Sequence, residues 1–157
     1  MTYAAPAIPA VGDLITAAQG AILAQNQIDA ADAWTAYTPT WTSSGTAPAL
    51  GNGTLTGRYQ QNGKSAQYEI RLTAGSTTTF GTGNYNFSLP TAAHDANPDA
   101  MGWAYVNIAG TRTAGVAIKA STALVNILVG SALLTNAVPG TMVATNTVSV
   151  SGSYEGA

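Results

Sequence analysis

The Asn62-Gly63 pair and the residues around it constrain the fold more than any other part of the chain. A type I′ hairpin turn needs positive φ at both central positions, and Asn-Gly supplies it at low cost. Pairing outward from Gln61 opposite Lys64 separates the side chains of both strands by polarity. The inward set is Leu55, Tyr59, Tyr68 and Ile70, and the outward set is Arg58, Gln67 and Glu69. The sequence therefore predicts a hairpin over residues 54–72.

Further segments alternate with the same period of two, which is typical of half-buried strands. They are residues 38–43, 85–89, 102–108, 112–119 and 148–155, the fourth joined to the third around Gly110. Residues 123–129 are almost entirely apolar and are expected to be a strand covered on both faces. Short strands separated by glycine-rich turns predict an all-β fold, an eight-stranded jelly-roll-like β-sandwich over residues 34–157.

Residues 1–33 differ from the rest of the chain. Pro6 and Pro9 predict an extended arm, because proline fixes φ and removes a backbone donor. A helix is expected from the N-cap Asp13 to residue 33, with Leu14, Ile22 and Ile28 among its apolar side chains. We interpret this region as a device for attachment and trimerisation. Packing of the helix on its own domain is the alternative.

Charge is scarce: 8% of residues are charged, against about 25% in a typical soluble domain. Weak self-repulsion favours the packing of identical subunits. The net charge of −2 argues against nucleic acid or an anionic membrane as a partner. The chain has no cysteine, and its first residues lack the basic region of a signal peptide, so we expect a soluble protein without a disulfide framework.

The residues that carry most enzyme chemistry are few and dispersed. His94 is the only imidazole, and its neighbour Asp95 is too close in sequence to face it as a triad member would. Together with Asp99 these residues could form at most an improvised metal site. Glu69 is expected to pair with Arg58 on the polar face of the hairpin. The sequence therefore predicts no catalytic residue, no cofactor and no metal, and a protein that is not an enzyme.

Most aromatic side chains occupy predicted inward positions, so core packing is the expected role of the group. An exposed set could instead stack on sugars. Trp34, Tyr37 and Trp41 lie where the helix gives way to the sheet, and they are expected to seal this junction or an interface between subunits.

Several segments resemble a module of tailed-bacteriophage structural proteins. They are YTPTWT (37–42), LGNGTLTGRY (50–59), IRLT (70–73), GSTTTFGTG (75–83), FSLP (87–90) and SGSYE (151–155). Members of this family are described as minor tail, tail-fibre or head-decoration proteins. The resemblance implies a compact β-sandwich, usually trimeric and exposed on the particle, and it transfers no catalytic residue.

The length of the amino-terminal region favours one place on the particle. A tail receptor-binding protein usually carries a substantial amino-terminal part, whereas only 33 residues precede the β domain here. We therefore expect a capsid decoration or short head-fibre protein on the virion surface, bound to itself and to the major capsid protein. The alternative is a tail-tip or tail-fibre component, bound to a tail protein, that recognises a host surface glycan. The predicted attachment and interface residues are Pro6, Pro9, Leu14, Ile22, Ile28, Trp34, Tyr37 and Trp41.

Overall fold

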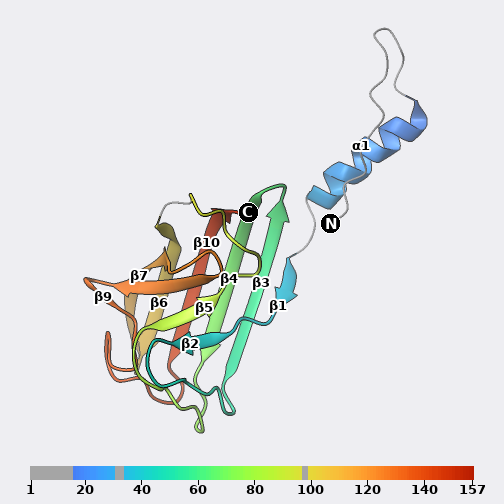
Figure 1. The fold of residues 1–157 in the computed structure, drawn as a ribbon. Coiled ribbons are helices and arrows are strands. Elements are labelled where there is room, and N and C mark those ends of the chain that lie inside the picture. The colour runs from blue at the N-terminus through green and yellow to red at the C-terminus, as the bar shows by residue number, and fades with distance from the viewer. Residues whose placement is uncertain (1–15, 31–33, 97–98) are drawn as a thin grey trace. The chain divides into compact units, whose positions relative to one another are not determined.

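A computed structural model describes residues 16–30, 34–96 and 99–157 (Figure 1). The chain divides into two compact units, Met1–Ala33 and Trp34–Ala157. The first contains one described helix, and the second contains all of the described strands. In the described part of the chain, no helix is long and apolar enough to cross a membrane.

Helix α1 runs from Ala17 to Ala30 and begins with a capping box. The Gln19 backbone N–H donates to Thr16 Oγ1 at 3.2 Å, and the Thr16 N–H donates to Gln19 Oε1 at 2.8 Å. These bonds satisfy two backbone donors that the helix leaves without partners. The described helix lies within the predicted range 13–33, and the predicted N-cap Asp13 and residues 31–33 lie outside the described residues.

Ten strands form one antiparallel hydrogen-bonded sheet. Its path is β1-β3-β4-β10-β6-β7-β8-β5-β2, and β9 pairs with β8 off this path. The strands are β1 Thr35–Tyr37, β2 Trp41–Ser43, β3 Thr54–Asn62, β4 Ser65–Thr73, β5 Tyr85–Ser88, β6 Ala100–Ile108, β7 Thr111–Lys119, β8 Leu124–Val129, β9 Ala132–Leu133 and β10 Thr147–Glu155.

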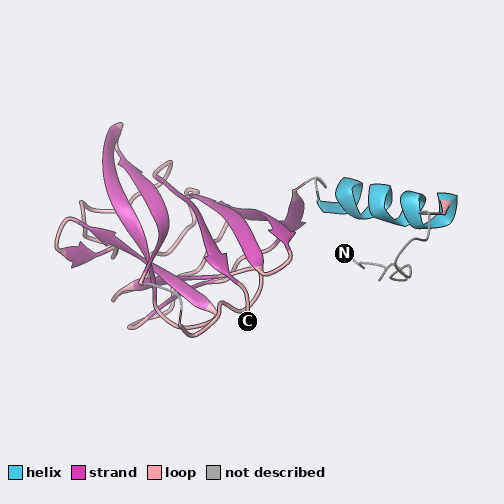
Figure 2. Cartoon of the chain, turned by 90° about the horizontal axis from the view of Figure 1, so that it is seen from above, coloured by secondary structure: helices cyan, strands magenta, loops and turns pink. Residues whose placement is uncertain are grey.

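The two end strands of this path, β1 and β2, are joined by only three residues, 38–40, so the sheet has to fold back on itself. Figures 1 and 2 show how strongly the strands curve. Three hydrogen bonds hold the returning edge. The Tyr37 hydroxyl donates to the Ser88 carbonyl oxygen at 3.2 Å, the Thr40 N–H donates to Ser88 Oγ at 2.8 Å, and the Ser88 N–H donates to the Thr40 carbonyl at 3.1 Å.

The all-β prediction is confirmed, whereas the specific eight-stranded jelly roll is not, because nine strands pair in one continuous path and β9 pairs with β8 beside it. The predicted strand 38–43 is also wrong in part. Only Trp41–Ser43 is strand, and residues 38–40 are the link that turns the chain. Pro39, buried in this link, has no N–H to give to a ladder.

The hairpin exists, but its register differs from the predicted one by two residues. Asn62 pairs with Ser65, so the turn is Gly63-Lys64, and Gly63 has a φ of 57°. A type II′ turn needs glycine at its first central position only, which this arrangement satisfies. Because side chains alternate with a period of two, a slip of two residues leaves every side chain on its predicted face.

The core lies inside the curled sheet and contains the predicted inward residues. Tyr68 and Ile70 are 0% and 2% exposed, and Leu55 and Tyr59 pack against the buried cluster from its margin. The alternating strands β5 and β10 add the following buried side chains: Tyr85, Phe87, Val148, Val150 and Tyr154. These alternations are therefore confirmed.

The neighbouring hairpin β6–β7 is also where the sequence predicted it. Ala109 and Gly110 form its turn with φ values of 48° and 88°, the positive pair that a type I′ turn requires. Strand β8 differs from its prediction, because it is covered fully on one face only. Val125, Ile127 and Val129 are buried, while the residues between them are partly exposed.

Candidate functional site

The outer face of the sheet carries a groove of about 550 Å³, which we call the outer groove. It crosses five neighbouring strands, β1, β3, β4, β10 and β6. Its lining residues are Ala36, Thr56, Gly57, Arg58, Glu69, Ile70, Arg71, Trp103, Tyr105, Ser149, Val150 and Ser151. A volume of this size is in the range of small-ligand pockets, which span about 300–1,000 Å³.

Strand register assembles the outer groove from residues that are far apart in sequence. One row of direct partners is Ala36–Arg58–Glu69–Ser151–Trp103, and the next is Thr56–Arg71–Ser149–Tyr105. Direct partners in antiparallel strands project from the same face with their Cβ atoms close together. The outer groove therefore has a charged side on β3 and β4, a floor of serines on β10, and an aromatic side on β6.

The aromatic side is the feature that sequence reasoning missed. Trp103 and Tyr105 are 56% and 46% exposed, and their rings meet edge to face with centroids 5.3 Å apart. Both lie in an apolar run, in which Ala104 and Val106 are the buried residues. Alternation alone does not orient a strand whose two faces are both apolar. Pairing with Ser149 and Ser151 on β10 would have placed both rings outward.

The charged side contains the predicted ion pair. Arg58 Nε donates to Glu69 Oε2 at 2.7 Å, and the two residues are direct partners across strands β3 and β4. The hydrogen bond and the charge of Glu69 raise the pKa of the Arg58 guanidinium. This guanidinium also lies over the Trp34 ring, 4.8 Å from its centroid, in cation–π geometry.

The three predicted interface residues of the β domain, Trp34, Tyr37 and Trp41, lie in two different environments. Trp34 lies beneath Arg58, whereas Tyr37 and Trp41 pack against the domain's own core. Trp41 meets the Tyr85 and Phe80 rings edge to face, at 5.1 and 6.3 Å between centroids. Ile22 lies on α1 and is partly exposed. Pro6, Pro9, Leu14 and the side chain of Ile28 lie outside the described residues.

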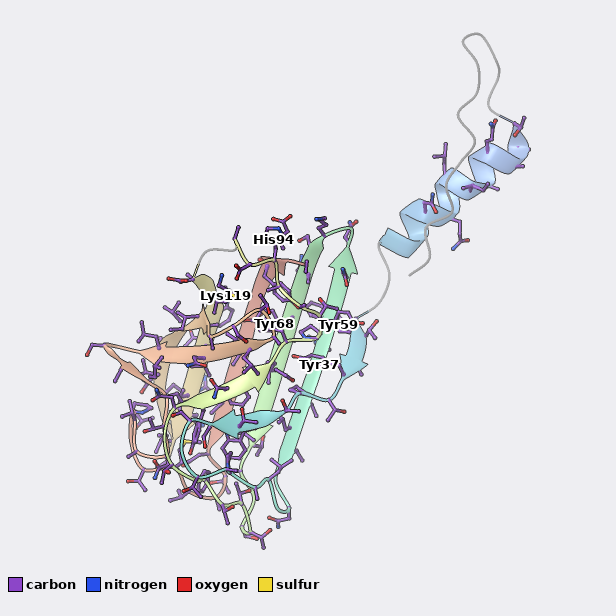
Figure 3. The ribbon with its side chains drawn as sticks, in the orientation of Figure 1. Tyr37, Tyr59, Tyr68, His94 and Lys119 are labelled. Carbon is purple, nitrogen blue, oxygen red and sulfur yellow. The ribbon has the colours of Figure 1, made fainter. Side chains whose placement is uncertain are left out.

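Tyrosines gather at one end of the interior, where Figure 3 labels three of them. Tyr37 meets Tyr59 edge to face at 5.9 Å between centroids, and Tyr68 meets Tyr154 at 5.7 Å. Burial raises the pKa of Tyr37, Tyr68 and Tyr154. The buried Tyr68 hydroxyl has no hydrogen-bond partner in the described structure. These side chains fill the core and keep their phenols neutral, which is a packing role.

His94 serves its own loop rather than a reactive cluster (Figure 3). Its ring Nδ1 accepts a hydrogen bond from the Ala96 N–H at 3.2 Å, and its backbone N–H donates to the Glu155 carbonyl at 2.7 Å. Lys119 Nζ donates to the Asp95 backbone oxygen. Over residues 16–30, 34–96 and 99–157, the structure contains no group of three acidic, histidine or cysteine side chains that could hold a metal ion.

Comparison with known proteins identifies no relative. No protein-family model matches the sequence, no curated protein is significantly similar to it, and no solved structure significantly matches its fold.

Proposed function

We propose that this chain is a non-enzymatic structural component of a bacteriophage virion. In this proposal it is a trimeric capsid decoration or short head-fibre protein, and its jelly-roll-like β domain is displayed on the particle surface. Residues 1–33 attach it to the major capsid protein and bring the subunits together. The resemblance of residues 34–90 and of the final strand to phage structural proteins points to the particle.

The observation that carries the proposal is that the β domain has a core of its own. The buried cluster extends from Ala66 to Tyr154, and the partly buried residues that pack on it begin at Tyr37. The helix-bearing unit, residues 1–33, contributes no described residue to this cluster. A domain that folds by itself next to a separate short unit is suited to display by one part and attachment by the other.

A second candidate is a tail-tip or tail-fibre component that binds a host surface glycan. The exposed Trp103 and Tyr105 favour it, because aromatic faces stack on the apolar faces of sugar rings. The serine floor and Arg71 of the outer groove would supply the polar contacts. In this case the β domain is the receptor-binding part.

Removal of residues 1–12 tests whether the amino-terminal region attaches the protein to the particle while residues 34–157 fold independently of it. The truncated protein is expected to fold, with a thermal midpoint within about 2 °C of the full chain, because the core of residues 34–157 is untouched. Its binding to particles that lack the wild-type copy is expected to fall at least about tenfold, a loss of about 1.4 kcal/mol. The measurement is occupancy after mixing purified protein with such particles, with the full-length chain as the control. Full occupancy by the truncated protein would mean that the β domain docks by itself.

A further inference from the structure

We propose that copies of this chain meet at the outer aromatic face, which we define as Trp103, Tyr105, Val116, Leu128 and Leu133 together with the adjoining outer groove. The inference rests on the proposed self-association and names the surface that carries it. The occupant of the outer groove is then a second copy of this chain.

The distribution of exposed apolar side chains points to this face. In the described chain, five large hydrophobic residues are at least 40% exposed, and three of them, Trp103, Tyr105 and Val116, lie here. Trp103 on β6 is the direct partner of Val116 on β7. The row continues through Leu128 on β8 to Leu133 on β9, both partly exposed. Scattered exposed hydrophobics are normal on a monomer, whereas a contiguous row across four strands is typical of an interaction surface.

The polar groups of the outer groove favour a protein occupant over a saccharide. A sugar needs several convergent donors and acceptors, but Arg58 and Glu69 are already bound to each other. Arg58 is also engaged with Trp34. The remaining polar groups are small hydroxyls and the Arg71 guanidinium, and most of the exposed lining is apolar. A protein surface with few charges complements such a groove better than a saccharide does. This chain has such a surface to offer, since only 8% of its residues are charged.

The size of the face indicates how strongly it can bind. The face defined above lies on eight strands, β1, β3, β4, β10, β6, β7, β8 and β9. Strands about 4.8 Å apart and roughly five residues of about 3.4 Å along each strand give a flat area on the order of 600 Å². Stable interfaces bury about 800 Å² per partner, so this face supplies much, but not all, of what is needed. Each subunit of a trimer has two neighbours, and α1, with Leu23 42% exposed, offers a further apolar surface. The face is therefore expected to strengthen an association that the helix begins.

The covalent structure supports a second copy as the occupant. Helix α1 ends at Ala30, and Ala36 on β1 already lines the outer groove. If helices of neighbouring copies associate, this short link tethers the grooves of those copies at a high effective concentration. Millimolar effective concentrations are typical of short linkers. At such an effective concentration even a weak contact between two outer aromatic faces forms. An unrelated partner is not tethered to this chain and would have to bind from free solution.

The test is the mass of the full-length protein by sedimentation equilibrium over a concentration series. We compare wild type with Trp103→Lys, and with Val143→Lys as the matched control, because Val143 is 48% exposed, lies outside the strands and does not line the outer groove. Trp103→Lys is expected to raise the concentration for half-assembly at least about 100-fold, since a desolvated ammonium opposes packing. Val143→Lys is expected to change it less than about threefold, as exposed substitutions usually do.

Each outcome decides the inference. A trimeric wild type whose mass is unchanged in Trp103→Lys and in Val116→Lys overturns this face while leaving trimerisation intact. A monomeric wild type at micromolar concentration overturns both the face and trimerisation. The particle-binding assay still tests the proposed function independently. If Trp103→Lys does not fold, Val116→Lys decides. Glycan-array binding that is lost in Trp103→Lys, with unchanged mass, would assign the face to a saccharide.

Discussion

Tyr68→Asp is expected to abolish cooperative folding of the β domain. Tyr68 is fully buried in β4, opposite Tyr59 in register, and its ring packs on Tyr154. Loss of a large buried ring destabilises by about 3–5 kcal/mol. A buried, unpaired carboxylate adds several kcal/mol. The sum approaches the whole stability of a small domain, about 5–15 kcal/mol. Urea unfolding followed by circular dichroism measures the loss.

Two matched substitutions separate the effect of charge from that of position. Tyr68→Phe removes only a hydroxyl that has no partner, so stability is expected to stay the same or rise by up to about 1 kcal/mol. Glu69→Gln alters the adjacent position on the opposite face, where the ion pair with Arg58 is exposed to solvent, so the free energy of unfolding is expected to change little. Equal losses from Tyr68→Asp and Glu69→Gln would show that the two faces have been assigned wrongly.

Alkaline pH is expected to unfold the domain cooperatively, beginning just above pH 10. Burial raises the pKa of Tyr85 to about 12 and raises that of Tyr68 further. Tyrosines in an unfolded chain ionise near pH 10. Above that pH the unfolded state releases protons that the folded state retains. Stability is therefore intact below about pH 10 and is lost as pH rises through the folded-state pKa values. Two such groups remove about 3 kcal/mol per pH unit.

The measurement pairs near-ultraviolet circular dichroism with tyrosinate absorbance across the alkaline range. We expect the signal of the packed aromatic residues to disappear in the same transition in which the buried tyrosines ionise. The variant Tyr85→Phe, which lacks one of these phenols, is the control and should shift the transition to higher pH if it folds with native stability. Gradual ionisation of every tyrosine near pH 10 with the native signal intact would contradict the buried cluster.

Much of the fold follows from local alternation in the sequence. The hairpin faces, the strand 85–88 and the C-terminal strand were predictable because polar and apolar residues alternate within each segment. The exact register around Gly63 was not predictable from polarity, since registers that differ by two residues sort the side chains equally well. The register depends on which two residues form the turn, Gly63-Lys64 or Asn62-Gly63, and both pairs contain the glycine that a hairpin turn needs. The capping box Thr16-x-x-Gln19 is a sequence signature of a helix start, so the beginning of α1 was also predictable.

The candidate site was less accessible to sequence reasoning. The outer groove requires five strands that are not consecutive in sequence, so no local motif marks it. Trp103 and Tyr105 lie in a strand that is apolar on both faces. Only its pairing with Ser149 and Ser151 of β10 shows that the two rings are on the outer face. The ion pair of Arg58 and Glu69 was predictable because both residues belong to one hairpin.

The central proposal is display on the surface of a phage particle, and labelling of intact particles tests it most directly. Fab fragments raised against the folded domain 34–157, imaged on unbroken particles by electron microscopy, are expected to mark the heads. Particles that lack this chain are the control and should carry no label. Label confined to tail tips would favour the glycan-binding candidate. Intact wild-type particles that stay unlabelled, while the protein is found only in the particle-free fraction, would contradict a surface role.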